Sequence, residues 1–189
     1  MKKIKGLLYC TKAKPYLVER LPFNEKKFYQ CRKKNDYHSL NGTIVAECEI
    51  EVEEITNCGT SFMIMKYDDL QESYRYTNEI ARGSCLDYND LKRYLGANNG
   101  YAIHIKNLHI FDKPINIRNY YNIATRTMED CLNQKTLLKA PQNMCNAYDV
   151  YKNHYIVISI QPKELCRIIN GEQTILIKKK VLNCMKGNK

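Results

Sequence analysis

Residues 155–180, close to the C-terminus, contain the pattern that most constrains the fold. An apolar, β-branched run at 155–160 predicts a buried strand. Pro162 stands at a first helical position and Gly171 just past the expected helix end, which predicts a short helix between them. A second apolar run at 175–177 leads into three consecutive lysines. The segment is therefore predicted to form a strand, a helix and a second strand that ends in positive charge.

Two other segments alternate between apolar and polar residues with the period of two that is typical of a half-buried strand. Residues 44–53 point apolar side chains one way and a row of glutamates the other way, namely Glu47, Glu49, Glu51 and Glu53. Such a row can recruit a metal or act in acid–base chemistry, but on an alternating strand it is more commonly the solvated face. Residues 101–111 also alternate, and the sequence 112–114, Asp-Lys-Pro, is expected to end that strand. On an ideal strand, His104 and His109 would fall on opposite faces.

Local signals also predict a helix and an N-terminal strand. Asp87 can cap a helix that Gly96 ends. Residues 6–10 form a short apolar strand, and a turn around Pro15 then brings two lysines near the end of that strand. With 189 residues, the chain is long enough for one core. We therefore expect an α+β fold in a single domain that covers residues 1–189.

The charge balance favours a polyanionic partner. The chain has 30 Lys and Arg against 20 Asp and Glu, a net charge of +10. Binding to phosphates would release counterions and would therefore depend on salt. A basic protein without a nucleic-acid partner is the alternative.

The cysteines predict neither a metal site nor disulfides. None of the nine forms a Cys-x-x-Cys pair and no histidine stands at zinc-finger spacing from such a pair, so a zinc site is not expected. We expect no other metal and no cofactor. The apolar part of the N-terminus is too short for a signal peptide, so we expect reduced thiols in the cytoplasm, with Cys48 and Cys166 as core residues. No apolar run is long enough to cross a bilayer, so no membrane association is expected.

Four blocks resemble ASCH domains, a branch of the PUA-like superfamily, and especially the phage and prophage members. They are residues 7–17, 40–48, 84–114 and the strand–helix–strand unit at 154–181. The resemblance implies a PUA-like mixed or antiparallel β-barrel with a few flanking short helices. In most relatives the strand–helix–strand unit precedes the Tyr-Cys-Thr-Lys block, whereas here it comes last. The resemblance therefore implies a circular permutation, in which the C-terminal unit completes the barrel that the first residues begin.

The same resemblance implies a degenerate active site. Family members thought to be enzymes, including amidohydrolases that act on acetylated cytidine, have a reactive Lys two residues after the signature Gly, then a polar Thr or Glu, then Arg. These positions hold Gln173, Leu176 and Lys178 here. An amide cannot serve as base or nucleophile, and Leu cannot move a proton. We therefore expect the catalytic chemistry to be lost.

A binding cleft is expected to remain between the turn at 11–16 and the hairpin at 171–178. Glu47 would accept a hydrogen bond from a base amino group, Tyr16 or another tyrosine of the cleft would stack on a base, and Gln173 would line the cleft. Phosphates would meet the lysines of both segments, namely Lys12, Lys14, Lys178 and Lys179.

The sequence thus predicts a non-catalytic module that binds RNA or a modified nucleoside or nucleotide in the cytoplasm of a bacterial host. One alternative is a nucleoside amidohydrolase or weak ribonuclease that uses Glu47 with Lys12. Another is a phage inhibitor that docks on a host defence complex, like an anti-CRISPR protein, or on an RNA-processing ribonucleoprotein.

Overall fold

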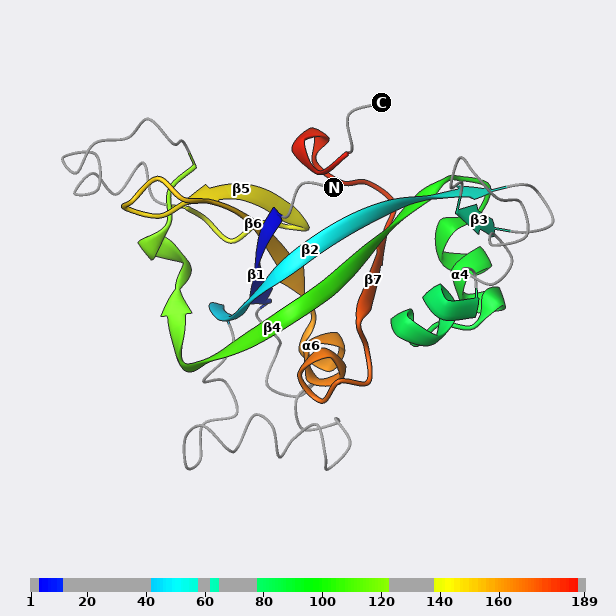
Figure 1. Ribbon diagram of the computed structural model, residues 1–189, viewed down its shortest axis with the longest axis horizontal. Coiled ribbons are helices and arrows are strands. Elements are labelled where there is room, and N and C mark those ends of the chain that lie inside the picture. The colour runs from blue at the N-terminus through cyan, green and yellow to red at the C-terminus, as the bar shows by residue number, and fades with distance from the viewer. Residues whose placement is uncertain (1–3, 12–41, 58–61, 65–77, 123–137, 187–189) are drawn as a thin grey trace. The chain divides into compact units, whose positions relative to one another are not determined.

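The computed structural model describes residues 4–11, 42–57, 62–64, 78–122 and 138–186 (Figure 1). The fold is α+β, as predicted. Its strands are β1 (Ile4–Cys10), β2 (Thr43–Asn57), β3 (Phe62–Ile64), β4 (Gly100–Asn116), β5 (Met144–Tyr148), β6 (His154–Ile160) and β7 (Ile175–Lys178). Its helices are α4 (Tyr88–Leu95) and α6 (Pro162–Ile169), with 3-10 turns η1 (Ile117–Asn119) and η3 (Asn183–Met185), and residues 78–84 are also helical.

The strands form a mixed sheet. They hydrogen-bond in the order β5-β6-β1-β2-β4-β7, with β3 paired to β2. β1 and β6 are parallel, with Gly6 opposite Ile156 and Cys10 opposite Ile160. β5 with β6, β2 with β3, and β4 with β7 are antiparallel. Thus β6, the first strand of the predicted strand–helix–strand segment, lies beside β1, the first strand of the chain (Figure 1).

The chain divides into two compact units. The β1–β6 unit contains Ile4–Glu49 and Asn107–Ile169, and the β7 unit contains Met1–Lys3, Ile50–Lys106 and Asn170–Lys189. Strands β2 and β4 contribute residues to both units.

The core of the β1–β6 unit is built on its parallel strand pair. Residues 6–10 of β1 and 155–160 of β6 are all buried, as expected for parallel strands that are covered on both faces. α6 begins at Pro162 and buries an apolar stripe that includes Cys166. One cluster of this core consists of Leu7, Tyr9, Ile44, Ile117, Tyr120, Leu138, Ala147, Tyr155 and Val157.

The core of the β7 unit lies between its strands and α4. Leu91 and Leu95, four residues apart on one helix face, are buried. The Asp87 carboxylate accepts a hydrogen bond from the Asp90 amide at 2.7 Å, and Gly96 ends the helix with φ 65°, so both helix-end predictions are confirmed. The buried cluster consists of Ile55, Phe62, Ile80, Leu91, Leu95, Ala102, Ile175 and Ile177.

The predicted strand–helix–strand unit is confirmed as β6, α6 and β7, and the alternating strand at 44–53 is confirmed within β2. The predicted end of the strand at 112–114 is wrong, because β4 continues through Pro114 to Asn116. A strand tolerates Pro where no ladder hydrogen bond is required from that position. β5 and the helical residues 78–84 were not predicted.

Candidate functional site

Lysines and tyrosines gather where β7, α4 and the C-terminal segment contribute to the β7 unit. Lys178, the last residue of β7, lies opposite Tyr101 of β4. The Lys179 ammonium lies 5.3 Å from the ring centroid of Tyr94, and the Lys186 ammonium lies 5.7 Å from that of Tyr101. Both distances are within the roughly 6 Å at which a cation is attracted to an aromatic face. We call these five residues, Tyr94, Tyr101, Lys178, Lys179 and Lys186, the cationic–aromatic surface.

This surface is built on fixed backbone and remains open to solvent. Tyr94 stands on α4 next to the buried Leu95 and is 41% exposed, while Lys179 and Lys186 are exposed. Ammonium groups over aromatic rings can meet phosphates, and an exposed ring can stack on a base. The arrangement can therefore hold a polyanion that carries planar groups.

Gln173 lies in the turn before β7 and is 4% exposed. Its Nε2 donates to the Ile175 carbonyl oxygen at 3.0 Å. The neighbouring Thr174 amide donates to the Gly83 carbonyl oxygen at 2.9 Å, which ties the turn to the end of helical residues 78–84. The Gln173 side chain therefore contributes to the conformation of the segment that leads into Lys178.

Glu47 belongs to the β1–β6 unit, whereas Gln173, Lys178 and Lys179 belong to the β7 unit. The Glu47 carboxylate is half-exposed, with Oε1 3.7 Å from His109 Nδ1. Thus the structure gathers the three C-terminal site residues in one unit. The other predicted site residues, Lys12, Lys14 and Tyr16, lie outside the described residues.

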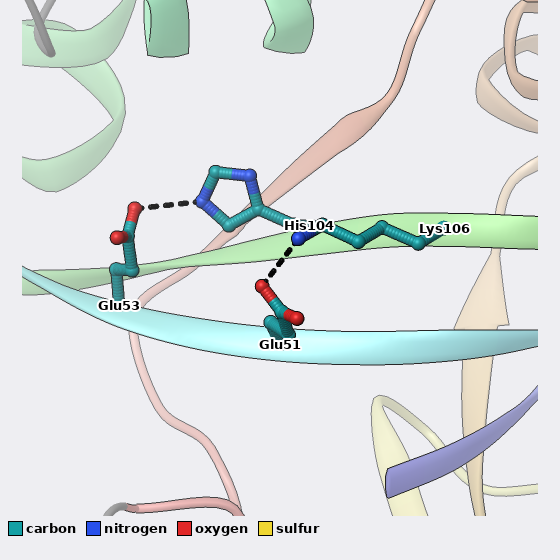
Figure 2. A network of polar contacts seen from close by, with 4 residues as sticks. All are labelled: Glu51, Glu53, His104 and Lys106. Atoms are coloured by element: carbon teal, nitrogen blue, oxygen red, sulfur yellow. Dashed lines mark hydrogen bonds and ion pairs between the residues drawn. The ribbon is translucent and has the colours of Figure 1, made fainter. Parts of the chain in front are cut away.

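Two further glutamates of β2 contact side chains of β4. Glu53 Oε2 lies 2.8 Å from His104 Nε2, and the Lys106 ammonium donates to Glu51 Oε2 at 2.6 Å (Figure 2). The hydrogen bond from Lys106 lowers the pKa of the Glu51 carboxyl. Glu51 and Lys106 therefore form a cross-strand pair of opposite charges on the polar face of β2 and β4. Within the part of the chain that the structure describes, no three His, Cys, Asp or Glu side chains are grouped to hold a metal ion.

The prediction that His104 and His109 face opposite ways is wrong, since each contacts a glutamate of the same alternating row. Asn107, between them, has φ 49°, in the left-handed region, and it and Lys106 are both exposed. Such a residue interrupts the strict alternation of an extended strand. The side-chain direction therefore changes between the two histidines.

A pocket of about 590 Å³ lies within the β1–β6 unit, and the sequence did not single it out. Its lining includes Ile115, Arg118, Asn119, Tyr120, Asp149 and Tyr151. Burial, and then the nearby groups Tyr155, Asp149 and Glu47, raise the pKa of the Tyr120 hydroxyl to about 12. The only signal in the sequence was the mixture of tyrosines and cations at 115–153.

No disulfide joins the cysteines of the described residues, namely Cys10, Cys48, Cys85, Cys145, Cys166 and Cys184. Cys48 and Cys166 are buried, as predicted, and burial raises the pKa of the Cys48 thiol to about 12. Among the helices of the described ranges, none has the length and apolar character to span a bilayer.

Comparisons with protein-family models, with curated proteins and with solved structures gave no match.

Proposed function

We propose that the chain is an RNA- or nucleotide-binding module with a PUA-like barrel of the ASCH type, circularly permuted, and that it binds its ligand without catalysing a reaction. The observation that carries this proposal is the cationic–aromatic surface, with Lys179 over Tyr94 and Lys186 over Tyr101. The net charge of +10 adds long-range attraction for a polyanion.

The chemistry of this surface suits single-stranded RNA. Lys gives point-charge contact with phosphates, which is independent of sequence, and tyrosine rings stack on any base. The side chain of Tyr94 is more exposed than that of Tyr101, which is half-buried opposite Lys178. The expected partner is therefore a flexible strand whose bases are unpaired and can reach the rings.

Two features favour binding over catalysis. The position where the resemblance places a reactive Lys is occupied by Gln173, whose amide donates to the Ile175 carbonyl oxygen. The position expected to be polar is Leu176, which is fully buried opposite Ile103. Neither side chain can accept a proton from a substrate.

Replacing Lys179 and Lys186 together by Ala is expected to weaken RNA binding and to reduce its salt dependence. Each phosphate contact with a single strand contributes about 0.7 to the slope of log K against log salt concentration, so the loss of two contacts should reduce the slope by about 1.4. The measurement is fluorescence anisotropy with a labelled single-stranded RNA at several salt concentrations.

The matched control replaces two exposed lysines of the other unit, Lys139 and Lys163, by Ala. This variant has the same net charge as the double variant above, so its slope should stay close to that of the unmodified chain. Equal slopes in both variants would rule out specific phosphate contacts at the cationic–aromatic surface. RNA affinity that does not change with ionic strength would rule out the proposed function.

Tyr94→Ala is expected to weaken RNA binding by about 1–3 kcal/mol, the contribution of one base stacked on an aromatic ring. Tyr94→Phe keeps the ring and should bind nearly as tightly as the unmodified chain. The comparison uses the anisotropy assay at one low salt concentration. Equal losses in both variants would show that the hydroxyl, and not stacking, is what matters at this position.

A further inference from the structure

The pocket of the β1–β6 unit has walls that are fixed before any ligand arrives. On one side, η1 is capped by Asn116, whose Oδ1 accepts from the Arg118 amide at 3.0 Å, and Ile117 of the same turn is buried in the core. The Tyr120 amide donates to the Ile117 carbonyl oxygen at 3.1 Å. Arg118 and Asn119 therefore project from a turn that is held at both ends.

On the other side, the hairpin between β5 and β6 is organised by the Asp149 carboxylate. Its Oδ1 accepts from the amides of Tyr151 and Asn153, both at 2.9 Å. Its Oδ2 accepts from Asn153 Nδ2 at 2.8 Å and from the Tyr155 hydroxyl at 3.4 Å. These four contacts occupy the acceptor positions of Asp149, so this side chain shapes the wall and does not present a free acceptor.

Apart from Asp149, the pocket presents apolar surfaces and hydrogen-bond donors to a ligand. Tyr151 is 83% exposed and Val150 46% exposed at the rim, although both are large apolar side chains. In the described part of the chain, the Arg118 guanidinium and the Asn119 amide make no side-chain hydrogen bond or ion pair. The pocket therefore offers an aromatic rim beside an uncommitted planar cation.

From this combination we infer that the pocket binds one nucleotide, with its phosphate on Arg118 and its base against Tyr151. The fork of a guanidinium matches phosphate oxygens in two parallel hydrogen bonds, and tyrosine stacks on any base. The volume of about 590 Å³ falls within the roughly 300–1,000 Å³ that is usual for small-molecule sites. Because the walls are already ordered, little conformational entropy is lost on binding.

The choice of a nucleotide among planar anions rests on the proposed function. The pocket and the cationic–aromatic surface nevertheless have no residue in common. Every residue lining the pocket belongs to the β1–β6 unit, and the cationic–aromatic surface belongs to the β7 unit. The nucleotide could be free or part of a single-stranded RNA, and the experiment separates these sources.

The test titrates the full chain with each nucleoside monophosphate up to 1 mM by calorimetry, with the matching nucleosides and inorganic phosphate as separate arms. At least one monophosphate should bind, and more tightly than its nucleoside or phosphate alone. Tyr151→Ala should weaken that binding roughly 5- to 150-fold, and Arg118→Ala roughly tenfold or more. Arg118→Lys should lie between the unmodified chain and Arg118→Ala, because Lys lacks the fork.

Arg93→Ala, which removes an exposed guanidinium of the other unit, is the matched control and should bind as the unmodified chain does. The inference is overturned if no monophosphate binds at 1 mM, if phosphate alone binds as tightly, or if Arg118→Ala and Tyr151→Ala bind normally.

A single-stranded RNA that displaces the monophosphate identifies RNA as a source, whereas simultaneous binding identifies the free nucleotide. If the unmodified chain binds no monophosphate but binds RNA in a salt-dependent way, the assignment of the pocket as a nucleotide site is wrong and the proposed function is unaffected.

Discussion

Gln173→Glu is expected to be far less stable than the unmodified chain at pH 7 and close to it at pH 4. Residue 173 is 4% exposed and its Nε2 donates to the Ile175 carbonyl oxygen. An ionised carboxylate would have no hydrogen to donate and would place a buried charge against that carbonyl oxygen. A protonated carboxyl can donate as the amide does.

The sign of the pH effect follows from the raised pKa of a buried carboxyl. An unfolded Glu has a pKa of about 4.3, and burial can raise the folded value by about 3 units or more. The variant should therefore keep its stability below about pH 4.3 and lose it progressively as the pH rises through the folded pKa. A shift of about 3 units corresponds to about 4 kcal/mol lost at neutral pH and above.

The measurement is denaturant unfolding of the variant and the unmodified chain at matched pH values from 4 to 8, so that the chain's own response to acid cancels. Glu172→Gln, at the exposed neighbouring position, is the control and should show a small difference that is flat with pH. If the difference in unfolding free energy between Gln173→Glu and the unmodified chain does not change with pH, residue 173 is solvated. The buried position of its side chain in the turn before β7 would then be wrong.

Elements with strong local signals could be predicted from the sequence. α4 has a capping Asp87 and a terminal Gly96 around its buried leucines, and α6 starts at Pro162. These signals act within a few residues, so they do not depend on the rest of the fold. β5 lacked such a signal, because its five residues are stabilised by pairing with β6.

The relations between strands were harder to predict. A single residue with positive φ, Asn107, changes the side-chain direction of β4, and its only mark in the sequence is the break in alternation at the two consecutive polar residues Lys106 and Asn107. The sequence indicated glutamates on one face of β2, but their partners His104 and Lys106 depend on which strand lies alongside. Strand pairing is a tertiary property, so these contacts required coordinates.

The candidate sites illustrate the same limit. Lys178 and Lys179 could be selected from the sequence because a cationic run follows an apolar strand. Their aromatic neighbours could not, since Tyr94 and Tyr101 come from segments more than seventy residues earlier in the chain. The pocket was missed for the same reason, because η1 and the hairpin at Asp149 are separated in sequence and meet only in the folded unit.

Leu95→Ala is expected to destabilise the chain by about 2–5 kcal/mol, because the side chain is fully buried and its removal leaves a cavity. The packing around it is tight, since a Cβ added at Gly100 would lie 2.6 Å from Leu95 Cδ2. For a chain of this size each kcal/mol lowers the Tm by roughly 2–4 °C. Thermal unfolding followed by circular dichroism measures the effect.

The same substitution links the core of the β7 unit to the proposed binding surface. Leu95 holds the last turn of α4, and its neighbour Tyr94 presents its ring to Lys179. Leu95→Ala should therefore speed hydrogen exchange in α4 and weaken RNA binding, although residue 95 itself is buried. Asn89→Ala, at an exposed position of the same helix, should change neither property. Normal RNA binding by a Leu95→Ala variant with a loosened α4 would mean that Tyr94 does not need a rigid support, and the stacking role assigned to it would lose its structural basis.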